Sequence, residues 1–155
     1  MQMTLGRRGD YAIRAVLHLA RHPGQRRKAR QIAEDMAIPP TYIPQILSDL
    51  VRLGIVSSQA GPEGGYELRH PASETSLLEV VEATSGAIES RECVLRGGPC
   101  RWEDACAVHE TWASAQSAFR EVLARTTFAD LAEQDEMLER TDADRGRQVE
   151  IADGH

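Results

Sequence analysis

Apolar residues recur at helical spacing in three segments near the start of the chain, at residues 10–21, 29–36 and 41–53. The third segment has the clearest pattern, because its apolar positions advance by steps of three and four residues and so share one helix face. Asp10 stands where the first segment begins, and its side chain could cap that helix. The chain is therefore predicted to open with three short helices.

Two β-compatible runs, residues 55–59 and 65–68, follow the third predicted helix. The residues between them, 60–64, are rich in glycine and proline and predict the tip of a hairpin. Three short helices followed by a hairpin is the element order of a winged helix-turn-helix. We therefore assign residues 1–72 to a winged helix-turn-helix domain, within a fold that is mostly α-helical with one small β-hairpin.

A short helix and a cysteine-bearing segment follow this domain. Ser76 and Glu79 have the spacing of a capping box and predict the start of a helix that ends near residue 84. The stretch after that helix has no apolar period and contains several glycines and all the cysteines. We assign residues 73–106 to this unit.

A longer helix is predicted at residues 107–125, with an apolar stripe on one face. The first domain has enough apolar faces to close on itself, so this stripe has little left in its own chain to pack on. Packing against a second copy of the chain satisfies it. We assign residues 107–138 to dimerisation, including a short last helix that Thr127 and Asp130 could cap, and expect the polar residues 139–155 to form a disordered tail. The stripe consists of Trp112, Ala115, Phe119 and Val122.

The net charge of −6 hides a division between the two halves of the chain. Residues 1–72 hold 10 Lys and Arg against 6 Asp and Glu, whereas residues 73–155 hold 8 against 18. A basic half joined to an acidic half indicates that one of them meets a polyanion. No apolar run approaches the ~18 residues of a membrane span, and the charged N-terminus is unlike a signal peptide, so we expect a cytoplasmic protein with no membrane partner.

Double-stranded DNA is the polyanion that a winged helix-turn-helix predicts. The second helix of such a motif enters the major groove with its N-terminal end first, and here that end lies near residue 41. Glutamine can pair with adenine there, threonine can reach a base edge or a phosphate, and basic side chains can bind phosphates. The candidate DNA-binding residues are Arg8, Lys28, Thr41, Tyr42, Gln45 and, in the wing, Gln59.

The three cysteines, Cys93, Cys100 and Cys106, lie close together, and their odd number argues against a disulfide framework. Their spacing lacks the close pairs of a structural zinc site, whereas a longer glycine-containing segment can wrap an iron–sulfur cluster. A cluster held by three thiolates has one position left for a ligand other than cysteine. His109 lies three residues after Cys106, and Asp10, from this chain or from a partner subunit, is the second candidate.

Several motifs together resemble the winged-helix regulators of the IscR, NsrR and RirA type over roughly residues 1–135. This resemblance implies a homodimer that binds promoter DNA, and a cluster held by three cysteines at the positions of Cys93, Cys100 and Cys106. It also implies that His109 as fourth ligand goes with a 2Fe–2S cluster, and Asp10 with a 4Fe–4S cluster. The segment shared with the thiolates favours His109. The motifs are Asp10–Arg14, Gln31–Ala33, Tyr42–Ile46, Leu53–Val56, Gly61–Tyr66, Leu78–Val81 and the cysteines followed by Trp112.

The pattern thus predicts a DNA-binding regulator, most simply a repressor, that senses iron, redox state or nitric oxide through its cluster. Two alternatives stay open: a regulator whose thiols are oxidised directly without a metal, and an interaction module whose acidic half binds a protein. An enzyme is not expected. Cys106 and His109 could form a nucleophile and base, but no third orienting group accompanies them, and 7 aromatic residues are few for a substrate pocket.

Overall fold

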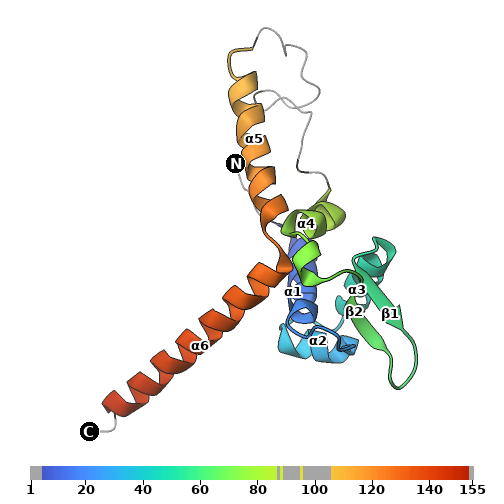
Figure 1. The fold of residues 1–155 in the computed structure, drawn as a ribbon, viewed down its shortest axis with the longest axis vertical. Coiled ribbons are helices and arrows are strands. Elements are labelled where there is room, and N and C mark those ends of the chain that lie inside the picture. Colours follow the sequence, from blue (N-terminus) through green and yellow to red (C-terminus); the bar gives the residue numbers. More distant parts are fainter. Residues whose placement is uncertain (1–4, 87, 89–94, 96–105, 154–155) are drawn as a thin grey trace.

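The computed structural model describes residues 5–86, 88, 95 and 106–153, and Figure 1 shows how its helices and hairpin are arranged. A winged-helix unit forms the body, and two long helices leave it in different directions. The mostly helical fold with one antiparallel hairpin is confirmed. The elements are α1 (Arg7–Ala20), α2 (Ala29–Asp35), α3 (Ile43–Arg52), β1 (Val56–Gln59), β2 (Gly65–Leu68), the 3-10 turn η1 (Ala72–Glu74), α4 (Leu77–Ser85), α5 (His109–Arg125) and α6 (Phe128–Asp153).

The hairpin that forms the wing is pinned to the loop before α2. β1 and β2 pair from Val56 opposite Leu68 to Gln59 opposite Gly65. Arg27 and Tyr66 exchange two backbone hydrogen bonds of 2.9 Å, which extends the hairpin by one bridge. Gly65 makes this approach possible, since its φ is +147° and a Cβ there would lie 2.8 Å from the Arg27 carbonyl oxygen.

The sequence offers capping residues at the starts of three helices, and two of them cap as predicted. The Ser76 hydroxyl accepts the Glu79 backbone N–H at 3.2 Å and starts α4. Thr127 and Asp130 cap each other at the start of α6, with the Thr127 backbone N–H donating to the Asp130 carboxylate at 2.9 Å. The prediction that Asp10 caps the first helix is wrong. α1 begins at Arg7, so Asp10 lies inside the first turn.

The core of the winged-helix unit is completed by the far end of the chain. Phe128, the first residue of α6, is fully buried and belongs to the same apolar cluster as α1, α2 and α3. Its backbone N–H donates to the Thr75 carbonyl at 2.9 Å, and the Leu77 N–H donates to the Thr126 carbonyl at 2.8 Å. The expectation that the first domain closes on its own residues is therefore wrong. The chain returns to it after α5.

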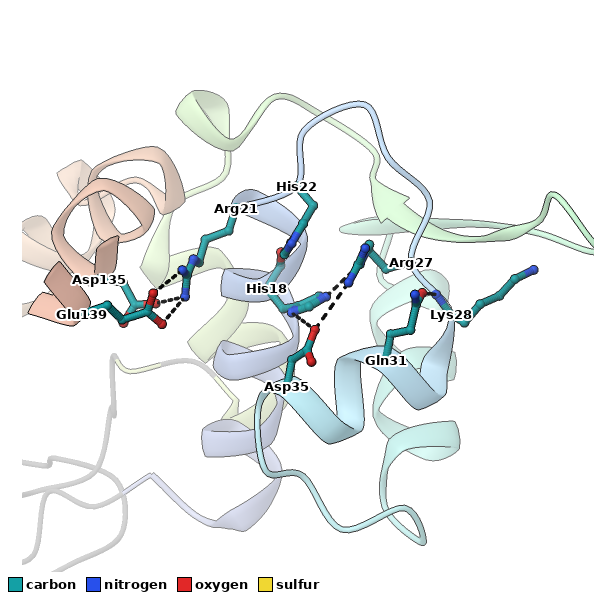
Figure 2. Close-up of polar contacts among 9 residues, drawn as sticks. All are labelled: His18, Arg21, His22, Arg27, Lys28, Gln31, Asp35, Asp135 and Glu139. Carbon is teal, nitrogen blue, oxygen red and sulfur yellow. Dashed lines mark hydrogen bonds and ion pairs between the residues drawn. The ribbon is translucent and has the colours of Figure 1, made fainter. Parts of the chain in front are cut away.

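The last helix is much longer than the sequence predicts. α6 continues to Asp153, so residues 139–153 are helical and the expected disordered tail is wrong there. In the first half of α6, Asp135 and Glu139 accept hydrogen bonds from the guanidinium of Arg21, the residue directly after α1, at 2.9 Å and 2.8 Å (Figure 2). A polar helix shows no apolar period, yet an anchored start and good helix formers are sufficient to build one.

Candidate nucleic-acid interface and cysteine segment

The recognition helix α3 exposes the residues that the sequence selects for base contact. Its apolar residues face the core, with Ile43, Ile46, Leu47 and Leu50 buried. Pro44 lies in the first turn, where its missing N–H breaks no helical bond. The other face is open to solvent and carries exposed Gln45, and Thr41 and Tyr42, also exposed, directly precede the helix.

Tyr42 directly precedes α3 and rests against a second tyrosine. Its ring centroid lies 5.4 Å from that of Tyr11 in α1, and the two ring planes are inclined by 52°. Tilted aromatic pairs at this separation attract each other. The pair fixes the N-terminal end of α3 against α1, and Tyr42 remains 42% exposed.

A buried carboxylate links the recognition helix to α1. Asp49 is 3% exposed, and its Oδ2 accepts a hydrogen bond from Arg8 Nη2 at 2.6 Å. Its Oδ1 accepts from Gln45 Nε2 at 3.1 Å and from Arg52 Nη2 at 3.0 Å. Burial alone would raise the pKa of Asp49, but the hydrogen bonds from Gln45 and Arg52 and the charge of Arg8 outweigh it and lower that pKa.

Sequence reasoning missed Asp49 and Arg52. A signal for them exists, because Gln45, Asp49 and Arg52 follow one another at spacings of four and three along a helix and so lie on one side of it. Two of the predicted DNA-binding residues, Arg8 and Gln45, are therefore already engaged by a protein group.

Lys28 holds the wing. Its ammonium donates to the Gly61 carbonyl at 3.0 Å and to the Pro62 carbonyl at 2.8 Å, both at the tip between β1 and β2. An ammonium has three donors, so one N–H remains for another acceptor. Gln59, the predicted wing contact, is exposed at the end of β1 opposite Gly65.

A buried histidine supports the basic loop between α1 and α2 (Figure 2). His18 is 2% exposed and accepts a hydrogen bond from Arg27 Nε at 3.1 Å, while Asp35 Oδ2 lies 3.8 Å from its Nδ1. Its ring lies against that of His22, with 4.5 Å between the ring centroids and an angle of 34° between the ring planes. Burial, and next the nearby His22 and Arg27, lower the pKa of His18 to about 4. The ring is therefore neutral at neutral pH.

The cysteine segment falls largely outside the described residues, among them Cys93 and Cys100. Cys106 is described, half-buried and not in a disulfide. His109 starts α5, and its backbone N–H donates to the Cys106 carbonyl at 3.1 Å, which places the two in one turn. Within the part that the structure describes, no three His, Cys, Asp or Glu side chains are grouped to hold a metal ion. The donor types present, a thiol and an imidazole one turn apart, suit a soft iron–sulfur site.

Asp10, the other candidate ligand, is held by its own helix. Its Oδ1 accepts from Arg14 Nε at 2.9 Å. Gly9 beside it lies against the end of α4, where a Cβ would come within 3.0 Å of the Ser85 hydroxyl. The first turn of α1 thus lies beside Ser85, the last residue of α4.

The long helix α5 leaves its apolar stripe largely uncovered. None of its residues, all of which the structure describes, is buried, and Phe119 and Val122 are 40% and 46% exposed. Its packing within the chain is against α4, where Arg120 Nε donates to Glu82 Oε1 at 3.1 Å. Trp112 is half-buried. The stripe of Trp112, Ala115, Phe119 and Val122 is therefore no part of the monomer core.

Together, a winged helix with an exposed recognition helix and a long helix outside the core define the class of DNA-binding transcriptional regulators. The sequence model of the Rrf2 family, described as iron-dependent transcriptional regulators, matches residues 5–134, and the chain belongs to this family. Its relatives and the similar solved structures are transcriptional regulators and not enzymes. No described helix is long and apolar enough to span a membrane.

Individual relatives agree with this family. The chain is 32% identical over 149 residues to the HTH-type transcriptional regulator IscR of Photorhabdus laumondii, which covers 94% of this chain and 90% of that protein. Among solved structures it is similar to CymR, the global cysteine regulator of B. subtilis, with a TM-score of 0.73 and 26% identity over 86% of this chain and 98% of the other. The oxidised form of Staphylococcus aureus CymR gives a TM-score of 0.66 and 30% identity, covering 84% and 97%.

Proposed function

We propose that two copies of the chain pair through α5 and bind promoter DNA in the cytoplasm as a repressor controlled by an iron–sulfur cluster. The observation that carries this proposal is the position of the turn containing Cys106 and His109. It leads directly into α5, the helix whose apolar face is exposed. A ligand bound at this turn acts on the start of the pairing helix.

Pairing through α5 has a direct geometric consequence for DNA binding. Two-fold pairing uses the same surface on both copies, so the stripe around Phe119 and Val122 would cover itself. It would also present two copies of α3, which regulators of this class place about 34 Å apart along the duplex. Since Arg120 ties α5 to Glu82 of α4, a change at the start of α5 reaches the winged-helix unit.

Each copy would bind DNA with base contacts from α3 and phosphate contacts around it. Thr41, Tyr42 and Gln45 are exposed on the face that enters the major groove. The guanidinium of Arg8, half-exposed beside α3, and the remaining N–H of Lys28 would bind phosphates. Exposed Gln59 would contact DNA from the wing. Phosphate contacts predict a steep fall in affinity with salt.

The cluster would be held by Cys93, Cys100 and Cys106, with His109 as the fourth ligand. The shared turn of Cys106 and His109 supports this choice and a 2Fe–2S cluster. Asp10 would instead complete a 4Fe–4S cluster, through the carboxylate oxygen that does not accept from Arg14. Such a cofactor supplies a group that iron supply, oxidants and nitric oxide can remove or alter. The protein's part is to hold it and to pass its presence to α5.

Iron and sulfide analysis after purification without air tests this ligand set. We expect iron in the wild type, strong loss in Cys106→Ala and His109→Ala, and wild-type content in Glu110→Ala, an exposed neighbour of His109 in the first turn of α5. Iron loss in Asp10→Ala with full content in His109→Ala would assign the fourth position to Asp10. Full content in both would contradict both assignments.

A second candidate is control by direct thiol oxidation. It is favoured by the relative from Staphylococcus aureus, whose structure is described as an oxidised form of CymR. Iron-free wild-type protein whose DNA affinity changes on oxidation, and recovers with a thiol reductant, would establish this candidate in place of the cluster.

A further inference from the structure

Asp49 accepts three side-chain hydrogen bonds on its two carboxylate oxygens. Oδ2 receives Arg8 from α1, and Oδ1 receives both Gln45 and Arg52 from the recognition helix itself. The carboxylate is buried, whereas the Arg8 and Arg52 side chains are 51% and 68% exposed. The two arginines balance its charge at a surface that would otherwise repel phosphates.

This arrangement removes a freedom that glutamine normally has. An exposed glutamine can rotate its amide by half a turn and present either the oxygen or the nitrogen. An ionised carboxylate only accepts hydrogen bonds, so the atom of Gln45 that faces Asp49 must be the nitrogen. The assignment of the two amide atoms therefore follows from the chemistry of the carboxylate that they face.

We infer that Asp49 is a specificity-determining positioning residue, which fixes the Gln45 amide with its nitrogen inward so that its oxygen faces a base. This inference rests on the proposed placement of α3 in the major groove. An outward amide oxygen accepts from an amino group, which adenine and cytosine present there. The second N–H of the amide can donate to N7, which makes adenine the best partner. Guanine and thymine present O6 and O4 instead and are disfavoured.

Replacement of Asp49 by asparagine tests the orientation while keeping the side-chain shape. Asparagine has one acceptor atom and one donor atom, so its amide nitrogen must meet either Arg8 or the pair of Gln45 and Arg52. If the nitrogen of residue 49 faces Gln45, the Gln45 amide turns over to accept from it and presents its own nitrogen outward. The base preference should then relax although Gln45 is still present.

The experiment begins with selection of binding sites from a random duplex library by the wild-type protein. The base pair whose identity becomes unimportant in Gln45→Ala is the one that Gln45 reads. Affinities for the preferred and the three substituted duplexes are then measured for wild type, Asp49→Asn, Gln45→Ala and the double variant. We expect Asp49→Asn to reduce the discrimination at this base pair about tenfold, and to change nothing further in the Gln45→Ala background.

The control is Arg52→Gln, which removes another partner of Asp49 and should leave the discrimination at this base pair intact. Asp49→Ala is measured beside Asp49→Asn, because it removes the acceptor for Gln45 whichever way the asparagine amide lies, and both arginines can then turn to solvent. Unchanged discrimination in Asp49→Ala would overturn the inference. An equal loss of affinity for all four duplexes, or the same loss of discrimination with and without Gln45, would overturn the inference and leave DNA binding in place. A wild type that selects no sequence would overturn the proposed function as well.

Discussion

Apolar side chains are buried in the winged-helix unit but largely exposed on the long helix α5. In the unit, Leu47 and Phe128 are fully buried, and every buried side-chain nitrogen and oxygen among the described residues has a hydrogen-bond partner. In α5, Phe119 and Val122 are 40% and 46% exposed, and no residue is buried. A side chain gains stability from burial only when another surface covers it. The unit is therefore complete within one chain, whereas α5 needs a second surface.

The largest difference should appear when the same residue type is removed from each region. Phe128→Ala leaves a cavity in the shared core and should lower the free energy of unfolding by about 3–5 kcal/mol. Phe119→Ala removes an exposed ring and should lower it by less than about 1 kcal/mol when measured on dilute, monomeric protein. Chemical denaturation measures both. Equal losses in the two variants would contradict the distinction between the two regions.

A charge placed on the stripe of α5 should act on pairing and leave the fold intact. Val122→Glu brings two carboxylates into the proposed interface, which opposes pairing because each would be buried without a partner. We expect a monomer in sedimentation and at least a tenfold loss of affinity for promoter DNA. Ser117→Glu, on an exposed polar part of the same helix, is the matched control and should remain dimeric. A Val122→Glu protein that stays dimeric would remove α5 from the interface.

The buried His18 should make the winged-helix unit sensitive to acid. The lowered pKa, about 4 in the folded chain against 6.5 unfolded, means that the unfolded chain takes up the proton first as the pH falls. This contribution to stability is complete above pH 6.5 and is lost between pH 6.5 and 4, to a limit of about 3 kcal/mol. His18→Gln keeps an acceptor for Arg27 and should flatten the pH profile of the unfolding free energy in this window. An unchanged profile would contradict it.

The smallest effect concerns the helix that joins the two regions. Ser76 caps α4, so Ser76→Ala should cost about 1 kcal/mol of stability. Ser73→Ala, an exposed serine in η1, should cost nothing measurable. Thermal unfolding of the two variants compares them directly. A loss confined to Ser73→Ala would mean that the cap at α4 carries no stability.

Some features of the fold could be predicted from the sequence and others could not. The helices, the hairpin and the caps at Ser76 and Thr127 could be predicted, because each depends on residues near one another in the chain. The burial of Phe128 and the bond from Lys28 to the wing tip could not, because they depend on contacts between distant segments. The length of α6 was missed because a helix held by polar contacts such as Arg21 to Glu139 leaves no apolar period to detect.

The same difference between local features and contacts of distant residues applies to the candidate site. The exposed position of Gln45 follows from the period of one helix and could be predicted, and Thr41 and Tyr42 are exposed just before that helix begins. The spacing of Gln45 and Asp49 indicates that the two can meet, but the bond from Arg8 could not be predicted, because it comes from another helix. Charged side chains reveal their partners only once the fold brings them together.

The most direct test of the regulatory account is the affinity of one promoter duplex for the same protein with and without its iron. Protein purified without air is divided, one half is stripped of iron by a chelator, and both are titrated into labelled DNA, with Cys106→Ala treated identically. Coupling of about 1–3 kcal/mol predicts affinities that differ roughly 5- to 150-fold in the wild type and agree in the variant. Equal wild-type affinities for the iron-loaded and iron-free forms would contradict the account.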